Sequence, residues 1–142
     1  MTMLKRTILA CLITAALAIP GLSEATESRT FKVGEGAPTL TVTLGEGVIR
    51  IQKGTETIQD IPCDEETLRE AENFSMDFVS LIDMNFDGFL DLQIPESLGS
   101  INVYYACYLW NPATESFERN DYLEEITSPR FDPARKEISS FC

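Results

Sequence analysis

Hydrophobic and polar residues alternate with a period of two in the first part of the chain, which is the pattern of β-strands with one buried face. In residues 39–44, three aliphatic residues alternate with three threonines, and residues 48–53 carry isoleucines on one face. Glycine-containing turns separate these segments from each other and from residues 55–61. The pattern predicts a three-stranded antiparallel β-meander.

The second half of the chain predicts further strands and two hairpins. Residues 76–82 carry hydrophobic side chains on both faces, as in a central strand. Residues 102–110 are rich in aromatic and β-branched residues and precede an Asn-Pro turn and a strand that starts at Phe117. An Asp-Pro turn at residues 131–136 repeats this arrangement, with a last strand at residues 137–141. The predicted fold class is all-β, built from short antiparallel strands and hairpins.

Two polar segments interrupt the strand pattern. Residues 26–37 are polar and contain two glycines, which predicts a flexible entry segment. Residues 64–72 have helical composition, but only Leu68 and Ala71 are apolar among them. A helix there would span one or two turns held by its neighbours, or would not form at all. For this acidic run we favour a solvated loop over a binding element.

Residues 1–25 have the organisation of a cleaved secretory signal peptide. Two basic residues precede an almost wholly apolar run at residues 7–19, and a small-x-small cleavage motif ends at Ala25. The apolar run is too short to span a bilayer. We therefore predict a periplasmic or secreted protein with no membrane span, in which residues 38–142 form a single β domain.

The charge and composition of the chain exclude several functions. It has 11 Lys and Arg against 23 Asp and Glu, a formal net charge of -12, and removal of the signal peptide changes this charge to -13. So acidic a surface does not replace the counterions of phosphate groups, which makes nucleic acids and anionic membrane surfaces poor partners. The chain has no histidine, which removes imidazole catalysis and histidine-ligated zinc. Close carboxylate pairs are inevitable in this composition and carry no catalytic argument, so we expect a non-enzyme.

Three cysteines remain after signal cleavage, and export makes a disulfide possible. Three single bridges can form, and each leaves one thiol over. Cys63–Cys107 is the slightly preferred pair, with a buried core thiol as the alternative for Cys107 because it lies in an apolar stretch. Cys142, the last residue, is the cysteine expected to stay free.

Residues 83–92 carry the clearest chemical signal, which is a calcium-type loop. Oxygen side chains occupy positions 1, 3, 5 and 9, and Gly88 occupies position 6, where the chain must reverse sharply. The predicted calcium ligands are the side chains of Asp83, Asn85, Asp87 and Asp91 and the carbonyl oxygen of Phe89. Position 12 is Ile94 in place of the bidentate glutamate of an EF-hand, so we expect an affinity on the order of 0.1–1 mM. The alternative is a metal-free turn, because Asp-Gly is a common turn dipeptide.

The order of these motifs resembles a family of bacterial periplasmic proteins. The motifs are the apolar strand and the Asp-x-Asn-Phe-Asp-Gly-x-x-Asp-Leu loop, the Leu-Trp-Asn-Pro-x-Thr-x-x-Phe segment at 109–117, Pro-x-Phe-Asp at 129–132 and Lys-x-Ile-x-Ser at 136–140. That family has a small β-propeller-like fold with calcium loops similar to those of integrin-type repeats, and some members are immunity proteins or inhibitors of lysozyme-like effectors. The resemblance covers about residues 74–141 and implies metal roles for the five loop residues. Relatives continue through further strands where this chain ends, which implies a form shortened at the C-terminus.

We therefore expect an exported calcium-stabilised binding protein, with an inhibitor or immunity protein against a basic cell-wall hydrolase as the leading hypothesis. Hydrolases that act on the anionic cell wall are often basic, and a net charge of -13 would speed encounter with them. The alternative is a secreted calcium-binding adhesion or carbohydrate-binding module. Trp110 and Tyr104, Tyr105 and Tyr108 would form its sugar platform, although aromatic residues that alternate in a strand are more often core. The sequence does not set the oligomeric state.

Overall fold

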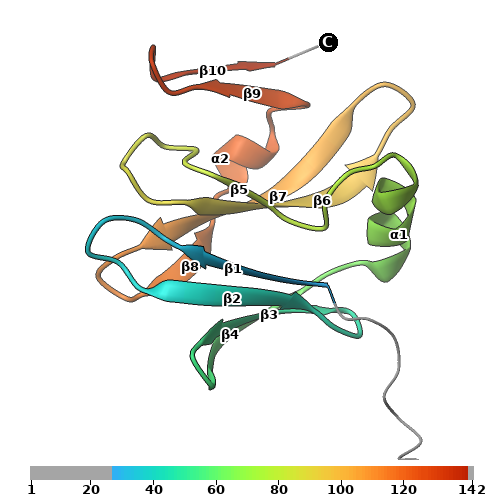
Figure 1. Cartoon of the computed structure of the whole chain (residues 1–142). Helices are drawn as coiled ribbons and strands as arrows, with labels where there is room; N and C mark the ends of the chain where they lie inside the picture. The colour runs from blue at the N-terminus through green and yellow to red at the C-terminus, as the bar shows by residue number, and fades with distance from the viewer. Residues whose placement is uncertain (1–26, 141–142) are drawn as a thin grey trace, which may run out of the picture.

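The computed structural model describes residues 27–140, which form two four-stranded antiparallel sheets and a two-stranded hairpin (Figure 1). The first sheet has the order β1(Ser28–Lys32), β2(Thr39–Leu44), β3(Val48–Lys53) and β4(Glu56–Pro62). The second has the order β5(Ser80–Ile82), β6(Asp91–Leu98), β7(Val103–Asn111) and β8(Ser116–Arg119), and the hairpin is β9(Pro129–Asp132) with β10(Glu137–Ser140). The other regular elements in residues 27–140 are two helices, α1(Glu65–Asn73) and α2(Asp121–Glu124). The predicted all-β fold is confirmed.

The first sheet contains the predicted meander and one additional strand. Strand β1 pairs with β2 from Ser28 opposite Thr43 to Lys32 opposite Thr39. Residues 26–37 were predicted to be a flexible entry segment, but within this range Ser28–Lys32 form β1. The apolar residues of this range give the physical reason, because Phe31 packs against the main core and Val33 is fully buried. The alternation of polar and apolar residues in this segment was thus a strand signal.

The main core lies between the two four-stranded sheets. Because side chains alternate across a strand, each sheet presents every second residue to the other. The first sheet contributes Leu40, Val42, Ile49, Ile51 and Ile61, and the second contributes Leu92, Ile94, Ala106, Tyr108, Trp110 and Phe117. The rings of Trp110 and Phe117 meet edge to face with centroids 5.0 Å apart.

A glutamine side chain joins the edges of the two sheets. Gln59 Nε2 in β4 donates to the carbonyl oxygen of Phe117 at 2.8 Å, and the Phe117 N–H donates to Gln59 Oε1 at 2.9 Å. Both Phe117 groups lie on the side of β8 that no strand pairs with. Gln59 therefore satisfies the backbone of an edge strand and fixes the position of one sheet relative to the other.

The opposite face of the second sheet is covered by α2 and the β9–β10 hairpin. Met84, Cys107 and Leu123 form a second buried cluster, and Phe131 and Ile138 of the hairpin pack against it. The three β-layers therefore stack one upon another, with the hairpin as the outermost layer (Figure 1).

The last two hairpins use the same turn, as the repeated Asx-Pro motif predicted. Asn111 Oδ1 accepts from the amide two residues later at 2.9 Å, and Asp132 Oδ1 does the same at 3.0 Å. Glu115 and Lys136 take equivalent places in the two turns, with φ of 48° and 55°. Both residues therefore occupy the left-handed region that glycine adopts most easily.

Helix α1 forms where an acidic loop was the favoured interpretation. Asp64 caps its first turn, because its carboxylate accepts from the Glu66 N–H at 3.0 Å and from the Thr67 hydroxyl at 3.1 Å. Leu68 and Ala71 are buried on the side that faces β6. The cap and these two apolar contacts are sufficient to hold a nine-residue helix.

The apolar segment before the loop differs from its prediction in length. Within residues 76–82, only Ser80–Ile82 form a strand, although Phe78 and Val79 are also buried in the main core. Arg29 is near this segment, because its guanidinium pairs with Asp77 at 2.5 Å and lies 5.8 Å from the centre of the Phe78 ring. Among residues 27–140 there is no helix with the length and apolar character needed to cross a membrane. The predicted signal peptide at residues 1–25 lies outside the described residues.

Candidate functional site

The predicted calcium loop connects β5 to β6, which makes it the first turn of the second sheet. Ile82 pairs with Asp91 at its base, so the flanks are strands and not the helices of an EF-hand. Gly88 has φ of 91°, as the reversal at position 6 requires. Phe86 also has a positive φ, of 61°, which is uncommon for an aromatic residue. The loop is a tight, locally strained turn.

Asp83, at position 1, folds the loop back on itself. Its Oδ1 accepts from the Asp87 N–H at 3.1 Å, and its Oδ2 accepts from the Gly88 N–H at 2.8 Å. Both bonds reach across the loop to residues four and five positions later. The carboxylate therefore lies on the inner side of the turn, where it accepts from two backbone N–H groups.

Asn85 and Asp87 lie beside each other in the same loop. Asn85 Nδ2 donates to Asp87 Oδ2 at 3.1 Å, and Asp87 Oδ1 accepts from the Phe89 N–H at 3.0 Å. Both side chains are exposed. The structure therefore brings together the first three predicted ligands, Asp83, Asn85 and Asp87, near the backbone of Phe89.

Asp91, at position 9, has a different environment and is fully buried. Its Oδ2 accepts from the Met84 N–H at 2.8 Å, and its Oδ1 accepts from the Trp110 N–H of the neighbouring strand at 2.9 Å. Burial raises the pKa of this carboxyl to about 6, opposed by the two backbone hydrogen bonds and assisted by the nearby charges of Asp87 and Asp83. The observed role of Asp91 is to tie the loop to β7.

The oxygen donors of the loop suit a hard cation, although only two of them are carboxylate groups. Two carboxylates, one amide and the Phe89 carbonyl are oxygen donors of the kind that calcium prefers, and each carboxylate oxygen keeps lone-pair capacity beyond its one amide bond. Nowhere in residues 27–140 are three or more Asp, Glu, Cys or His side chains gathered closely enough to hold a metal ion. The cation would therefore depend on the Asn85 amide and the backbone carbonyl. Such a set is consistent with modest affinity.

The structure does not join the two cysteines that were predicted to pair. Cys63 and Cys107 are both free thiols, and they lie in different hydrophobic clusters. Cys107 points to the face of the second sheet that α2 covers, whereas Cys63 follows β4 and packs against the main core. The predicted bridge is therefore not formed, and burial raises the pKa of Cys107 to about 12 and that of Cys63 to about 11. Cys142 lies outside the described residues.

Sequence patterns gave no indication of a cleft that opens beside helix α1. Its volume is about 280 Å³. The lining residues are Ile61, Pro62, Cys63, Asp64, Ile94, Pro95, Glu96, Ala106, Tyr108 and Arg119. The cleft therefore lies between the end of β4 and the face of the second sheet.

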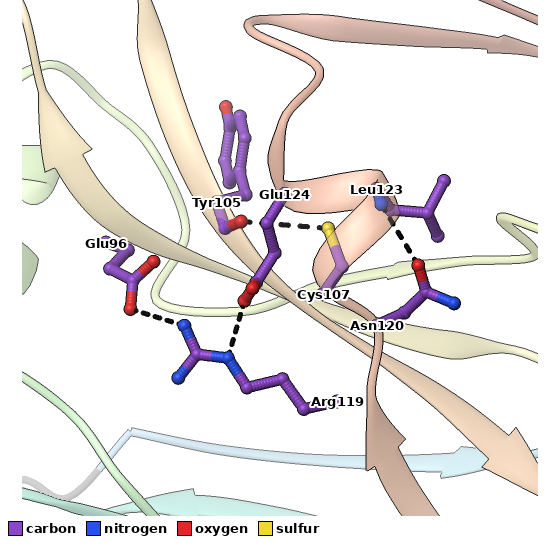
Figure 2. A network of polar contacts seen from close by, with 7 residues as sticks. All are labelled: Glu96, Tyr105, Cys107, Arg119, Asn120, Leu123 and Glu124. Carbon is purple, nitrogen blue, oxygen red and sulfur yellow. Dashed lines mark hydrogen bonds and ion pairs between the residues drawn. The ribbon is translucent and has the colours of Figure 1, made fainter.

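Arg119 is the basic residue among those that line the cleft, and its guanidinium pairs with two carboxylates from other elements. Figure 2 shows its guanidinium between Glu96 of β6 and Glu124 of α2, with N–O distances of 2.8 Å to each. The hydrogen bond to Glu96 is the main reason that the pKa of Arg119 is raised above its ordinary value. These partners are 23 and 5 residues away in sequence, so no local motif could have indicated the network.

The aromatic residues of β7 do not form a sugar platform. Trp110 and Tyr108 are buried in the main core, and Tyr105 packs against the second cluster on the opposite face. Tyr104 alone among the four is exposed, at 41%. The interpretation of this stretch as core is therefore the one that the packing supports.

Comparisons of the chain with protein-family models, with curated proteins and with solved structures gave no match.

Proposed function

We propose that the protein is an exported, calcium-stabilised binding protein that inhibits a basic cell-wall hydrolase in the periplasm or outside the cell. Its action is to occupy the hydrolase and not to catalyse a reaction. The observation that carries this proposal is the placement of acidic side chains around α1, beside the cleft.

Helix α1 and its cap present a dense negative surface. Five carboxylates in residues 64–72 are exposed, and Arg69 is the only basic residue in that range. The five are Asp64, Glu65, Glu66, Glu70 and Glu72. Asp64 also lines the cleft, so the acidic surface adjoins the concave one.

Much of the positive charge of the protein is already paired with its own carboxylates. Five of its basic residues form ion pairs within the described chain: Arg29, Arg50, Lys53, Arg119 and Arg135. The surplus of acidic residues therefore dominates the surface field. A field of this kind raises the association rate of an oppositely charged partner by roughly 10- to 1,000-fold at low ionic strength.

Calcium has a structural role in this proposal. Asp83, Asn85, Asp87 and the carbonyl oxygen of Phe89 would hold the ion, with Asp91 at the base of the loop. The ion would neutralise two carboxylates that repel each other and would close the turn between β5 and β6. The β5–β6 loop and α1 lie on opposite sides of the molecule in Figure 1. Loss of calcium should therefore reduce stability more than it reduces charge-driven encounter.

The proposal is tested by measuring association with purified basic lysozyme-like hydrolases and their residual activity on cell wall. The triple variant Glu65→Gln, Glu66→Gln and Glu70→Gln removes three charges from α1 without a change in size. We expect its association rate to fall by about tenfold at low salt and the difference to vanish at high salt. The matched control, Glu35→Gln, Glu118→Gln and Glu137→Gln, removes the same charge from exposed sites elsewhere.

Two results would reject the proposal. One is wild-type protein that neither binds nor inhibits any hydrolase of the panel. The other is a control triple variant that slows association as much as the α1 variant, because the effect would then come from net charge and not from the surface at α1.

A further inference from the structure

The candidate cation loop is in close contact with the first sheet. The contact is made by the β1–β2 turn, residues 33–37. A Cβ atom added to Gly34 would lie 2.7 Å from Phe89 Cδ1 and 2.8 Å from the carbonyl oxygen of Gly88. No side chain larger than that of glycine fits this gap without displacement of the loop. Gly34 does not have a positive φ, so the glycine is required by the close approach and not by backbone conformation.

A backbone hydrogen bond accompanies this contact. The Leu90 N–H donates to the Val33 carbonyl oxygen at 2.7 Å. Val33 is fully buried, and its own N–H donates to the Pro38 carbonyl at 3.1 Å. The Ala37 N–H donates to the Gly34 carbonyl at 3.2 Å, which closes the turn. The acceptor of the Leu90 N–H therefore belongs to a buried residue of a turn that has its own backbone hydrogen bonds.

The hydrogen bond fixes the direction of one predicted ligand. The Phe89 carbonyl and the Leu90 N–H belong to the same peptide group, which is planar and trans. In such a group the C=O and N–H vectors point in opposite directions. Because the N–H points to Val33, the Phe89 carbonyl points away from the β1–β2 turn. On the other side, the Phe89 N–H is held by Asp87 Oδ1 at 3.0 Å.

We propose that the β1–β2 turn is a positioning element of the cation site, through Gly34 and the carbonyl of Val33. It aims the Phe89 carbonyl at the cation, although no atom of the turn contacts the ion. This inference rests on the calcium binding proposed above. It adds that the site is built from two sheets, so calcium binding and the docking of the first sheet on the second stabilise each other by the same free energy.

The test compares two alanine variants of the same turn in the mature protein, residues 26–142. Gly34→Ala introduces the contact with Phe89 and Gly88 without backbone strain. Gly36→Ala introduces strain, because Gly36 has φ of 71°, but its Cβ would meet no atom within 4 Å. We expect Gly34→Ala to weaken calcium binding by about tenfold or more, as loss of a positioning contact does at other metal sites. Gly36→Ala should lower the melting temperature in chelator and change the calcium Kd by less than about twofold.

Calcium affinity is measured by isothermal titration calorimetry and folding by circular dichroism. Amide hydrogen exchange of the wild type provides a readout that needs no variant, should Gly34→Ala fail to fold. Calcium should slow exchange of the Leu90 amide in the loop and also of the Val33 amide in the first sheet. Slower exchange at Leu90 with no change at Val33 would overturn the coupling.

The calorimetric outcomes separate this inference from the one on which it depends. A wild type that does not respond to calcium overturns both the cation site and its positioning by the first sheet. A wild type that binds calcium, together with a folded Gly34→Ala variant of unchanged affinity, overturns the role of the turn alone. Weaker binding by Gly34→Ala but not by Gly36→Ala supports it.

Discussion

Replacement of Asp91 by asparagine should change how the stability of the protein depends on pH. The folded carboxyl has a pKa of about 6, raised from 3.8 chiefly by burial. Between these two values the folded protein binds more protons at this site than the unfolded chain does. The contribution of Asp91 to stability is therefore fully present below pH 3.8 and is lost as the pH rises through 6.

The size of the effect follows from the same two values. Between pH 4.5 and pH 7.5, linkage gives a loss of about 2 kcal/mol in the unfolding free energy of the wild type relative to Asp91→Asn. Asparagine cannot accept from both the Met84 and Trp110 N–H groups, because one of its two polar atoms is a donor. The variant should therefore be less stable than the wild type at pH 4.5, and the gap should narrow toward pH 7.5.

Urea denaturation in a calcium chelator, at several pH values in this range, measures the gap. Asp60→Asn is the control, because the hydrogen bond from Arg50 lowers the pKa of the exposed Asp60 carboxyl below 3.8. The contribution of Asp60 to stability therefore changes with pH only below pH 4.5. The difference in unfolding free energy between Asp60→Asn and the wild type should stay constant from pH 4.5 to pH 7.5. If the difference in unfolding free energy between Asp91→Asn and the wild type is also constant with pH, burial does not raise the pKa of Asp91 and the reasoning is refuted.

Three further predictions concern other parts of the molecule. Calcium at ten times its Kd should stabilise the wild type by about 1.4 kcal/mol, and Asp87→Ala should abolish the accompanying rise in melting temperature; an unchanged rise would remove this ligand from the site. Gln59→Leu should lose about 2 kcal/mol in urea denaturation, because two hydrogen bonds to the Phe117 backbone disappear; a loss below 0.5 kcal/mol would contradict the proposed link between the sheets. Lys136→Gly should gain about 0.5 kcal/mol by thermal denaturation, because glycine relieves the positive φ, whereas Lys136→Ala should gain nothing.

Strands with a clear two-residue period could be predicted from the sequence. The meander of residues 39–61 and the two Asx-Pro hairpins were found because local residue patterns specify them. Strand β1 was not predicted, because the polar residues and glycines of residues 26–37 outweighed the two alternating apolar positions, Phe31 and Val33. Helix α1 was underestimated because its stability depends on a cap and on contacts with β6, which the sequence does not display.

The loop shows the same division between local and long-range information. Spacing alone placed Asp83, Asn85 and Asp87 in one turn, and the structure brings them together. The partners of Asp91 could not be predicted, because the Trp110 N–H lies 19 residues away. The contact between Gly34 and Phe89 spans a still longer separation, and nothing in its local sequence marks that glycine as different from others in turns.

Trp110 is the only tryptophan of the chain, and its position makes it an internal optical probe. Its ring lies between the two sheets against Phe117, while its backbone N–H is bonded to Asp91 at the base of the loop. A single fluorophore therefore senses both the packing of the main core and the closure of the loop. Its emission can follow folding and calcium response in the unlabelled protein, with no second tryptophan to confuse the signal.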